Sequence, residues 1–126
     1  MKLSIAIVLL TLLFLGLGWY SETLIARQAE SILSELENLA TCLQEGKTAE
    51  IDRQLARINQ LWLSARRFWV LLTDHHDLDD FELYLARTKS YLANKAYILA
   101  LSGIAEMKQT IHRIPDQLRL NLENIF

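Results

Sequence analysis

Residues 51–72 read IDRQLARINQLWLSARRFWVLL, and this stretch decides the fold. Its apolar residues recur at alternating intervals of four and three residues. They are Ile51, Leu55, Ile58, Trp62, Ala65, Trp69 and Leu72. This spacing places them along one face of a helix, and such a face packs knobs-into-holes against a neighbouring helix. The stretch therefore predicts one helix of a bundle, with this face buried.

The preceding segment carries a second apolar face with the same alternation. The face consists of Ile25, Ala29, Ile32, Leu36, Leu39 and Leu43. Ser21 is a possible N-cap, unless an upstream helix runs straight through it, and Gly46 is the expected C-cap. The next helix is expected to start at Thr48, and so short a turn makes the two helices antiparallel neighbours. Cys42 lies beside the apolar face and is interpreted as a buried structural thiol.

The helical pattern breaks at residues 73–77, and a third helix is expected after the break. Its apolar face consists of Leu78, Phe81, Leu85, Thr88 and Leu92. Asp79 and Glu82 have the spacing of a capping box, so Asp79 is the expected N-cap, with Asp77 one turn earlier as the alternative. Asp77, Asp79 and Glu82 are therefore assigned a structural capping role.

A fourth helix is expected to restart after Asn94, although one continuous helix is the alternative. Its expected apolar face consists of Ile98, Leu101, Ala105, Ile111 and Ile114. Pro115 is expected to end the helical part, because proline lacks a backbone N–H and clashes with the preceding turn. The apolar residues of the tail, residues 116–126, predict that it packs back on the bundle or lies near a membrane surface.

The first twenty residues differ in character from the rest. Leu3 to Tyr20 read LSIAIVLLTLLFLGLGWY without a charge, and a helix of that length spans about 27 Å, close to the hydrocarbon core of a bilayer. Its eleven Leu, Ile, Val and Phe residues favour insertion by roughly 3–7 kcal/mol. Trp19 and Tyr20 are expected at the membrane interface. A cleaved signal peptide is the alternative, but Gly16 and Gly18 form a poor cleavage site, so an uncleaved signal anchor is favoured.

The fold class is therefore all-α: an N-terminal transmembrane helix followed by a small antiparallel helical bundle of three to four helices. The expected domains are the signal anchor at 1–20, the bundle at 21–115 and the tail at 116–126, packed on the bundle. The chain of 126 residues has only 4 Gly and 1 Pro, too few turn residues for a many-stranded sandwich or barrel.

The charged residues suggest how the chain is oriented in a membrane, and they do not suggest a nucleic-acid partner. Lys2 precedes the apolar stretch, so the positive-inside rule places the amino terminus in the cytoplasm and the bundle outside the cell membrane. The net charge of −2 lacks the basic excess expected of a nucleic-acid binder. Arg66 and Arg67, beside the tryptophans, are interpreted as a solvated helix edge close to lipid headgroups.

The densest polar chemistry lies between Asp74 and Glu82, with two histidines and five carboxylates. If the helices alternate in direction, this turn is membrane-proximal and His112 returns to the same end. His75, Asp77, Asp79 and His112 could then converge as a metal site, since imidazole and carboxylate suit zinc, manganese or iron. Structural capping is favoured over metal binding and over a protonation switch through the paired histidines.

Catalytic motifs are not found. No serine occupies a nucleophile-elbow motif, and no glycine-rich phosphate loop occurs in the sequence. Trp62 and Trp69 are interpreted as core residues rather than ligand-stacking ones. The sequence therefore predicts a protein that is not an enzyme and needs no cofactor.

Several motifs together resemble one known family. They are Trp62-x6-Trp69, the element from Asp74 to Glu82, Leu85-Ala86-Arg87 with Tyr91, His112-Arg113-Ile114-Pro115 and the ending Leu120-Asn121-Leu122-Glu123-Asn124-Ile125-Phe126. Over essentially the whole chain this resembles the bacterial family catalogued as domain of unknown function 4363. Members usually carry Glu where this chain has Asp77. The resemblance implies a small membrane-anchored helical protein of Gram-positive, often spore-forming bacteria, and it implies no activity. It also suggests that the Asp74–Glu82 turn, Ile114-Pro115 and the tail form one unit at one end of the bundle.

The expected function is that of a non-enzymatic interaction or accessory subunit for another membrane protein. It would present the membrane-proximal end of the bundle to that partner, and homo-oligomers are possible. The alternative is a metal- or pH-sensing module that uses the Asp74–Glu82 turn and His112.

Overall fold

The computed structural model describes residues 1–125, without the side chains of residues 121, 122, 124 and 125. Within that range the chain is all-α. Four α-helices and one 3-10 turn follow in the order α1 (Lys2–Glu45), η1 (Thr48–Glu50), α2 (Ile51–Trp69), α3 (His75–Ala93) and α4 (Tyr97–Ile125). The predicted break near Asn94 is confirmed, so residues 77–114 form two helices rather than one.

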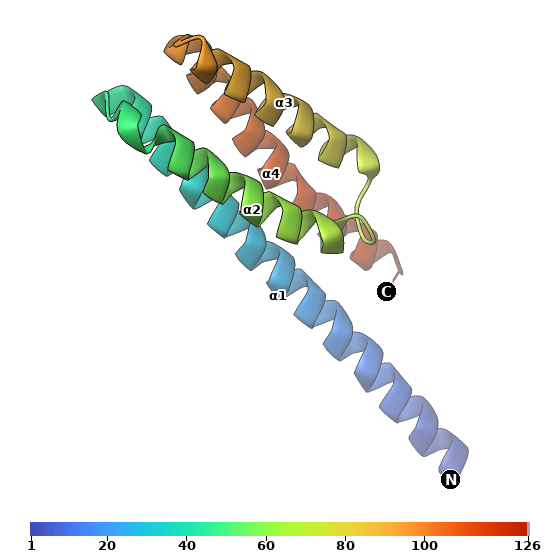
Figure 1. The fold of residues 1–126 in the computed structure, drawn as a ribbon. Coiled ribbons are helices and arrows are strands. Elements are labelled where there is room, and N and C mark those ends of the chain that lie inside the picture. Colours follow the sequence, from blue (N-terminus) through green and yellow to red (C-terminus); the bar gives the residue numbers. More distant parts are fainter. Residues whose placement is uncertain (126) are drawn as a thin grey trace.

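Helix α1 is one continuous helix whose first part is exposed and whose second part packs in the bundle. It passes through Ser21 without a break, so Ser21 is not an N-cap, and it ends at Gly46, whose φ of 73° is left-handed. The Gly46 N–H donates to the carbonyl of Cys42, which satisfies an otherwise free helix-end acceptor. The apolar first part is long enough to cross a membrane, and none of its most apolar 18-residue window is buried. In Figure 1 this part of α1 extends well beyond the other helices.

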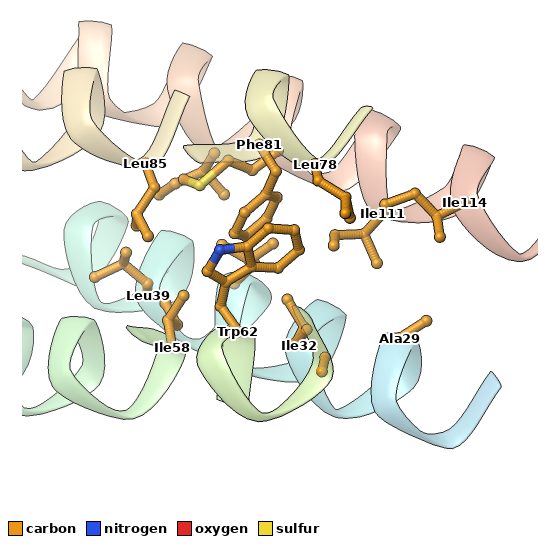
Figure 2. Packing of buried hydrophobic residues seen from close by; sticks show 14 of the residues in the cluster. Ala29, Ile32, Leu39, Ile58, Trp62, Leu78, Phe81, Leu85, Ile111 and Ile114 are labelled. Atoms are coloured by element: carbon orange, nitrogen blue, oxygen red, sulfur yellow. The ribbon is translucent and has the colours of Figure 1, made fainter. Parts of the chain in front are cut away.

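The other half of α1 forms the bundle core with the remaining helices. The predicted faces of α1 and α3 are buried throughout, as is that of residues 51–72 except for Leu55 and Leu72, which are half-buried. Helix α1 packs against α2 and α4, and α3 packs against α4. Helices α2 and α3 meet through large side chains, since the Trp62 and Phe81 rings lie 4.1 Å apart between centroids (Figure 2). The four helices thus enclose one core.

Helices α3 and α4 approach closely at a glycine. A Cβ added to Gly103 would lie 2.2 Å from the hydroxyl oxygen of Thr88, which is fully buried and donates to the carbonyl of Tyr84 at 2.8 Å. The missing side chain at Gly103 therefore makes room for Thr88.

The prediction for the first half of α4 was wrong. Ile98 and Ala105 are exposed and Leu101 is half-buried, although Ile111 and Ile114 are buried as expected. The buried face begins instead with residues that fit close helix packing. It consists of Ala100, Gly103, Ile104, Met107, Thr110, Ile111, Ile114 and Leu118.

Pro115 does not end the helical part, which corrects a second prediction. It lies inside α4, and the tail continues as helix to Ile125. An internal proline costs about 3 kcal/mol, but Ile111, Ile114 and Leu118 bury apolar surface on both sides of it, and each buried side chain returns roughly 1.5–3 kcal/mol. Tertiary packing thus outweighs the local preference. Neither of the two expected domain boundaries coincides with the end of a helix. Helix α1 continues from residue 20 to residue 21, and α4 continues from residue 115 to residue 116.

Candidate functional site

One end of the bundle lies where the exposed part of α1 begins. Two contacts across the helices mark this end. Arg119 of α4 pairs with Glu22 of α1, with Nε 2.9 Å from Oε1. Trp69 at the end of α2 donates its indole N–H to Oε1 of Gln28 in α1 at 2.8 Å. We refer to residues 19–28, 69–77 and 113–120 as the proximal end, and Figure 1 shows these segments together on the side of the exposed α1 segment.

The start of α3 is capped by Asp74, so the N-cap prediction for Asp79 or Asp77 was wrong. The Oδ1 atom of Asp74 accepts from the backbone N–H of His76 at 3.1 Å. The helix begins one turn earlier than the capping-box spacing suggested. Asp77 consequently lies in the first turn, where a negative charge stabilises the helix dipole, and Asp79 is exposed on the helix surface.

Asp77 is a buried carboxylate with a partner from α4. Its side chain is 8% exposed, and Oδ1 lies 3.5 Å from a terminal guanidinium nitrogen of Arg113. The same nitrogen of Arg113 contacts the hydroxyl of Thr110 at 3.4 Å. The expectation that this part of α4 returns to the start of α3 is therefore correct, but Arg113 rather than His112 meets Asp77.

Glu82 connects α3 to α2 instead of capping a helix. Its Oε1 accepts the indole N–H of Trp62 at 3.2 Å. Arg66 Nε lies 2.5 Å from the same oxygen, but its N–H is not aligned for a hydrogen bond, so the contact is an ion pair. Trp62 also makes an edge-to-face contact with Trp69, with centroids 5.9 Å apart. Both tryptophans are buried, which agrees with their interpretation as core residues.

The four residues predicted as a possible metal site do not form one. His75, Asp79 and His112 are exposed, whereas Asp77 is buried against Arg113. His112 lines a shallow groove between α1 and α4 with Glu30, Pro115 and Asp116, away from the start of α3. Among the described residues, no three His, Cys, Asp or Glu side chains are grouped so that they could hold a metal ion.

His76 makes a contact that sequence reasoning had not assigned. Its Nε2 lies 3.7 Å from Oδ2 of Asp80, one turn further along α3, and the histidine side chain is 80% exposed. A charged pair forms here only when His76 is protonated. Because its surroundings are solvent, such a pair contributes little to stability.

Arg113 and Asp74 are two residues of this end whose roles the sequence analysis missed, besides His76 and the Arg119–Glu22 and Trp69–Gln28 contacts. Asp74 could have been found as the first acidic residue after the break. The sequence pointed to Arg113 less clearly. The direction of a helix predicts how far along the bundle a residue lies, but it does not predict which neighbouring helix the side chain faces.

The comparisons with known proteins match this architecture to one family. The model of the family described as Domain of unknown function (DUF4363) matches residues 19–125. The chain belongs to this family. No curated protein and no solved structure matches it. The DUF4363 match includes Trp19, Tyr20 and the whole bundle, and it leaves most of the exposed apolar segment outside.

Proposed function

We propose that this DUF4363 protein is a non-enzymatic accessory subunit of another membrane protein, with a signal anchor in the bacterial cell membrane and its bundle outside the cytoplasm. The observation that carries the proposal is the complete exposure of the most apolar stretch of the chain. Large exposed apolar surfaces mark membrane or protein interaction sites. A helix of this length and composition is stable in the hydrocarbon core of a bilayer.

The continuity of α1 supports a positioning role. Because α1 has no break between the apolar stretch and the bundle, the anchor and the bundle move as one rod. The contacts of Arg119 with Glu22 and of Trp69 with Gln28 attach α4 and α2 to this rod just beyond Tyr20. Such a protein holds the proximal end at a set height above the membrane, where a partner can meet it.

The orientation rests on Lys2, which precedes the apolar stretch and is expected to stay in the cytoplasm. The partner is expected to contact the exposed polar start of α3, which includes His75 and Asp79. The alternative of a metal or pH sensor lacks a grouped ligand set among residues 1–125, so we develop the accessory role.

Site-specific crosslinking in cells tests the proposal. A photoreactive amino acid at Asp79, in α3 next to the proximal end, is compared with one at Gln44, which is also exposed but lies in the last turn of α1, at the opposite end of the bundle. We expect a discrete crosslinked product at position 79 that contains a second membrane protein, and none at position 44. Repeated recovery of the protein alone would contradict the accessory role, and a product of twice its own mass would replace it with self-association.

A further inference from the structure

We propose that the proximal end of the bundle rests on the lipid surface through Leu71 and Leu120, in addition to the anchor. This inference depends on the anchor of the proposed function, but it concerns a separate surface. Leu71, between α2 and α3, is 78% exposed, and Leu120, near the end of α4, is 60% exposed. On α1, Trp19 and Tyr20 are 72% and 61% exposed.

Leu120 lies close to the level at which α1 would enter the membrane. It follows Arg119, which pairs with Glu22 of α1. Glu22 is about 3 Å beyond Tyr20 along the helix axis, at 1.5 Å per residue. Tyr20 and Trp19 are expected at the membrane interface, where amphipathic aromatic rings are most stable. The exposed side chain of Leu120 is therefore at headgroup height.

Leu71 lies somewhat higher. It follows Trp69, whose indole bonds to Gln28, about 12 Å beyond Tyr20 along α1. The chain continues toward the membrane after Trp69, since the N–H groups of Leu72 and Thr73 donate to the Trp69 carbonyl in helix-like turns. This descent leaves Leu71 about 9 Å beyond Tyr20.

A modest tilt closes the remaining distance. Transmembrane helices tilt by about 20° on average, and neighbouring helix axes lie about 8–10 Å apart. Tilting α1 toward α2 lowers Leu71 by about 3 Å, to about 6 Å beyond Tyr20, which is within the headgroup layer of about 5–7 Å. Leu71 and Leu120, which lie on separate segments, then contact the lipid in addition to the anchor. The anchor and the two leucines together set the tilt and rotation of the bundle relative to the membrane.

Flanking polar groups limit how deep the leucines can go. Leu120 adjoins the Arg119–Glu22 ion pair, and Leu71 precedes the exposed Asp74 and His75. Charged groups avoid the hydrocarbon core, so the leucines are expected in the headgroup layer and not among the acyl chains. The carboxylates at this end also mean that anionic lipids do not supply the attraction.

Lipid is favoured over a protein partner because the patch continues a surface that lipid already covers. Leu120 follows Arg119, whose partner Glu22 lies where α1 becomes exposed and apolar, and Leu71 follows Trp69, which bonds to Gln28 at the same end of the bundle. Ile98, at the opposite end, is 85% exposed but has no such continuity, so it serves as a matched control.

Depth-dependent fluorescence quenching of the full chain in vesicles tests the proposal. Cys42 is replaced by Ala, and an environment-sensitive fluorophore is attached to L71C, L120C, I98C or L12C in uncharged phosphatidylcholine vesicles that carry nitroxide lipids. We expect blue-shifted emission and severalfold greater quenching by a shallow nitroxide at positions 71 and 120 than at position 98. Position 12 should be quenched most by a deep nitroxide.

The outcomes separate the two proposals. If position 12 is quenched but 71 and 120 behave like 98, the anchor stands and the lipid contact is refuted. If position 12 is not quenched by lipid, the anchor itself fails. If labels at 71 and 120 are shielded from water but not quenched by lipid nitroxides, and this depends on the protein-to-lipid ratio, a second copy covers the patch and the lipid contact is again refuted.

Discussion

Replacing Gly103 by alanine is expected to destabilise the bundle, although alanine is the better helix former. In a free helix this change stabilises by about 1 kcal/mol. Here the new Cβ would lie 2.2 Å from the Thr88 hydroxyl oxygen, far inside van der Waals contact. Either α3 and α4 move apart, at about 1–3 kcal/mol for overpacking, or Thr88 rotates and loses its bond to Tyr84, at about 1–3 kcal/mol for an unsatisfied buried hydroxyl.

The net loss for Gly103→Ala is then up to about 2 kcal/mol, or up to roughly 8 °C in the melting temperature of a bundle of this size. A double-mutant cycle isolates the cause. Thr88→Ala removes the clashing oxygen and leaves the Thr88 Cβ 3.4 Å from the added methyl group, an ordinary contact. In that background Gly103→Ala should stabilise by up to about 1 kcal/mol.

Urea unfolding in mild detergent, followed by the fluorescence of the buried Trp62 and Trp69, measures both free energies. Ser102→Ala is the matched control, because Ser102 is exposed on the same helix turn, and it should stabilise by no more than about 0.5 kcal/mol. If Gly103→Ala stabilised the protein equally with and without Thr88, the close approach of α3 and α4 would be refuted.

Four further substitutions test the corrected details by the same urea titration. Asp74→Ala should cost about 1 kcal/mol, because it removes the N-cap of α3, whereas Asp79→Ala should change stability by less than about 0.5 kcal/mol; equal losses would contradict the helix start. Asp77→Ala should cost about 0.5–1.5 kcal/mol, since it removes a first-turn carboxylate paired with the half-exposed Arg113, and a neutral effect would argue against that pair. Pro115→Ala should stabilise by about 1–3 kcal/mol, because it restores a helical N–H inside α4, and a loss of stability would show that the proline is needed there.

Most of the fold could be predicted from the sequence because its strongest signal is periodic. The regular alternation in α1 and α2 identified nearly every buried residue of those helices, and Gly46 was recognisable as the end of α1. In the first half of α4 the predicted apolar face was wrong, whereas Ile111 and Ile114 in the second half are buried as expected. Ile98 is exposed, whereas Ala100 and Gly103 are buried where α3 and α4 pack closely.

Local rules were less reliable where they competed with tertiary packing. Pro115 should have ended α4, but the buried residues on both sides of it hold the helix together. Several acidic residues follow the break at 73–77, and the capping-box spacing favoured Asp79, whereas the hydrogen bond to His76 identifies Asp74. Which of these acidic residues is the N-cap depends on where the turn between α2 and α3 ends.

At the candidate site the sequence predicted how far along the bundle a residue lies, but not which neighbouring helix its side chain faces. Helix direction placed residues 112–113 near the start of α3, which the structure confirms. Neighbouring residues on a helix point about 100° apart, so the same reasoning could not tell that Arg113 meets Asp77 while His112 faces the groove beside α1.

The central claim is that lipid surrounds Leu3–Tyr20 in the mature protein. The most direct measurement is the intact mass of the endogenous protein, taken after membranes have been separated from soluble material and washed at alkaline pH. The account predicts a species near 14.6 kDa that retains the apolar segment and stays in the washed membrane pellet. A shorter species that begins at Trp19, found in the soluble fraction, would contradict it.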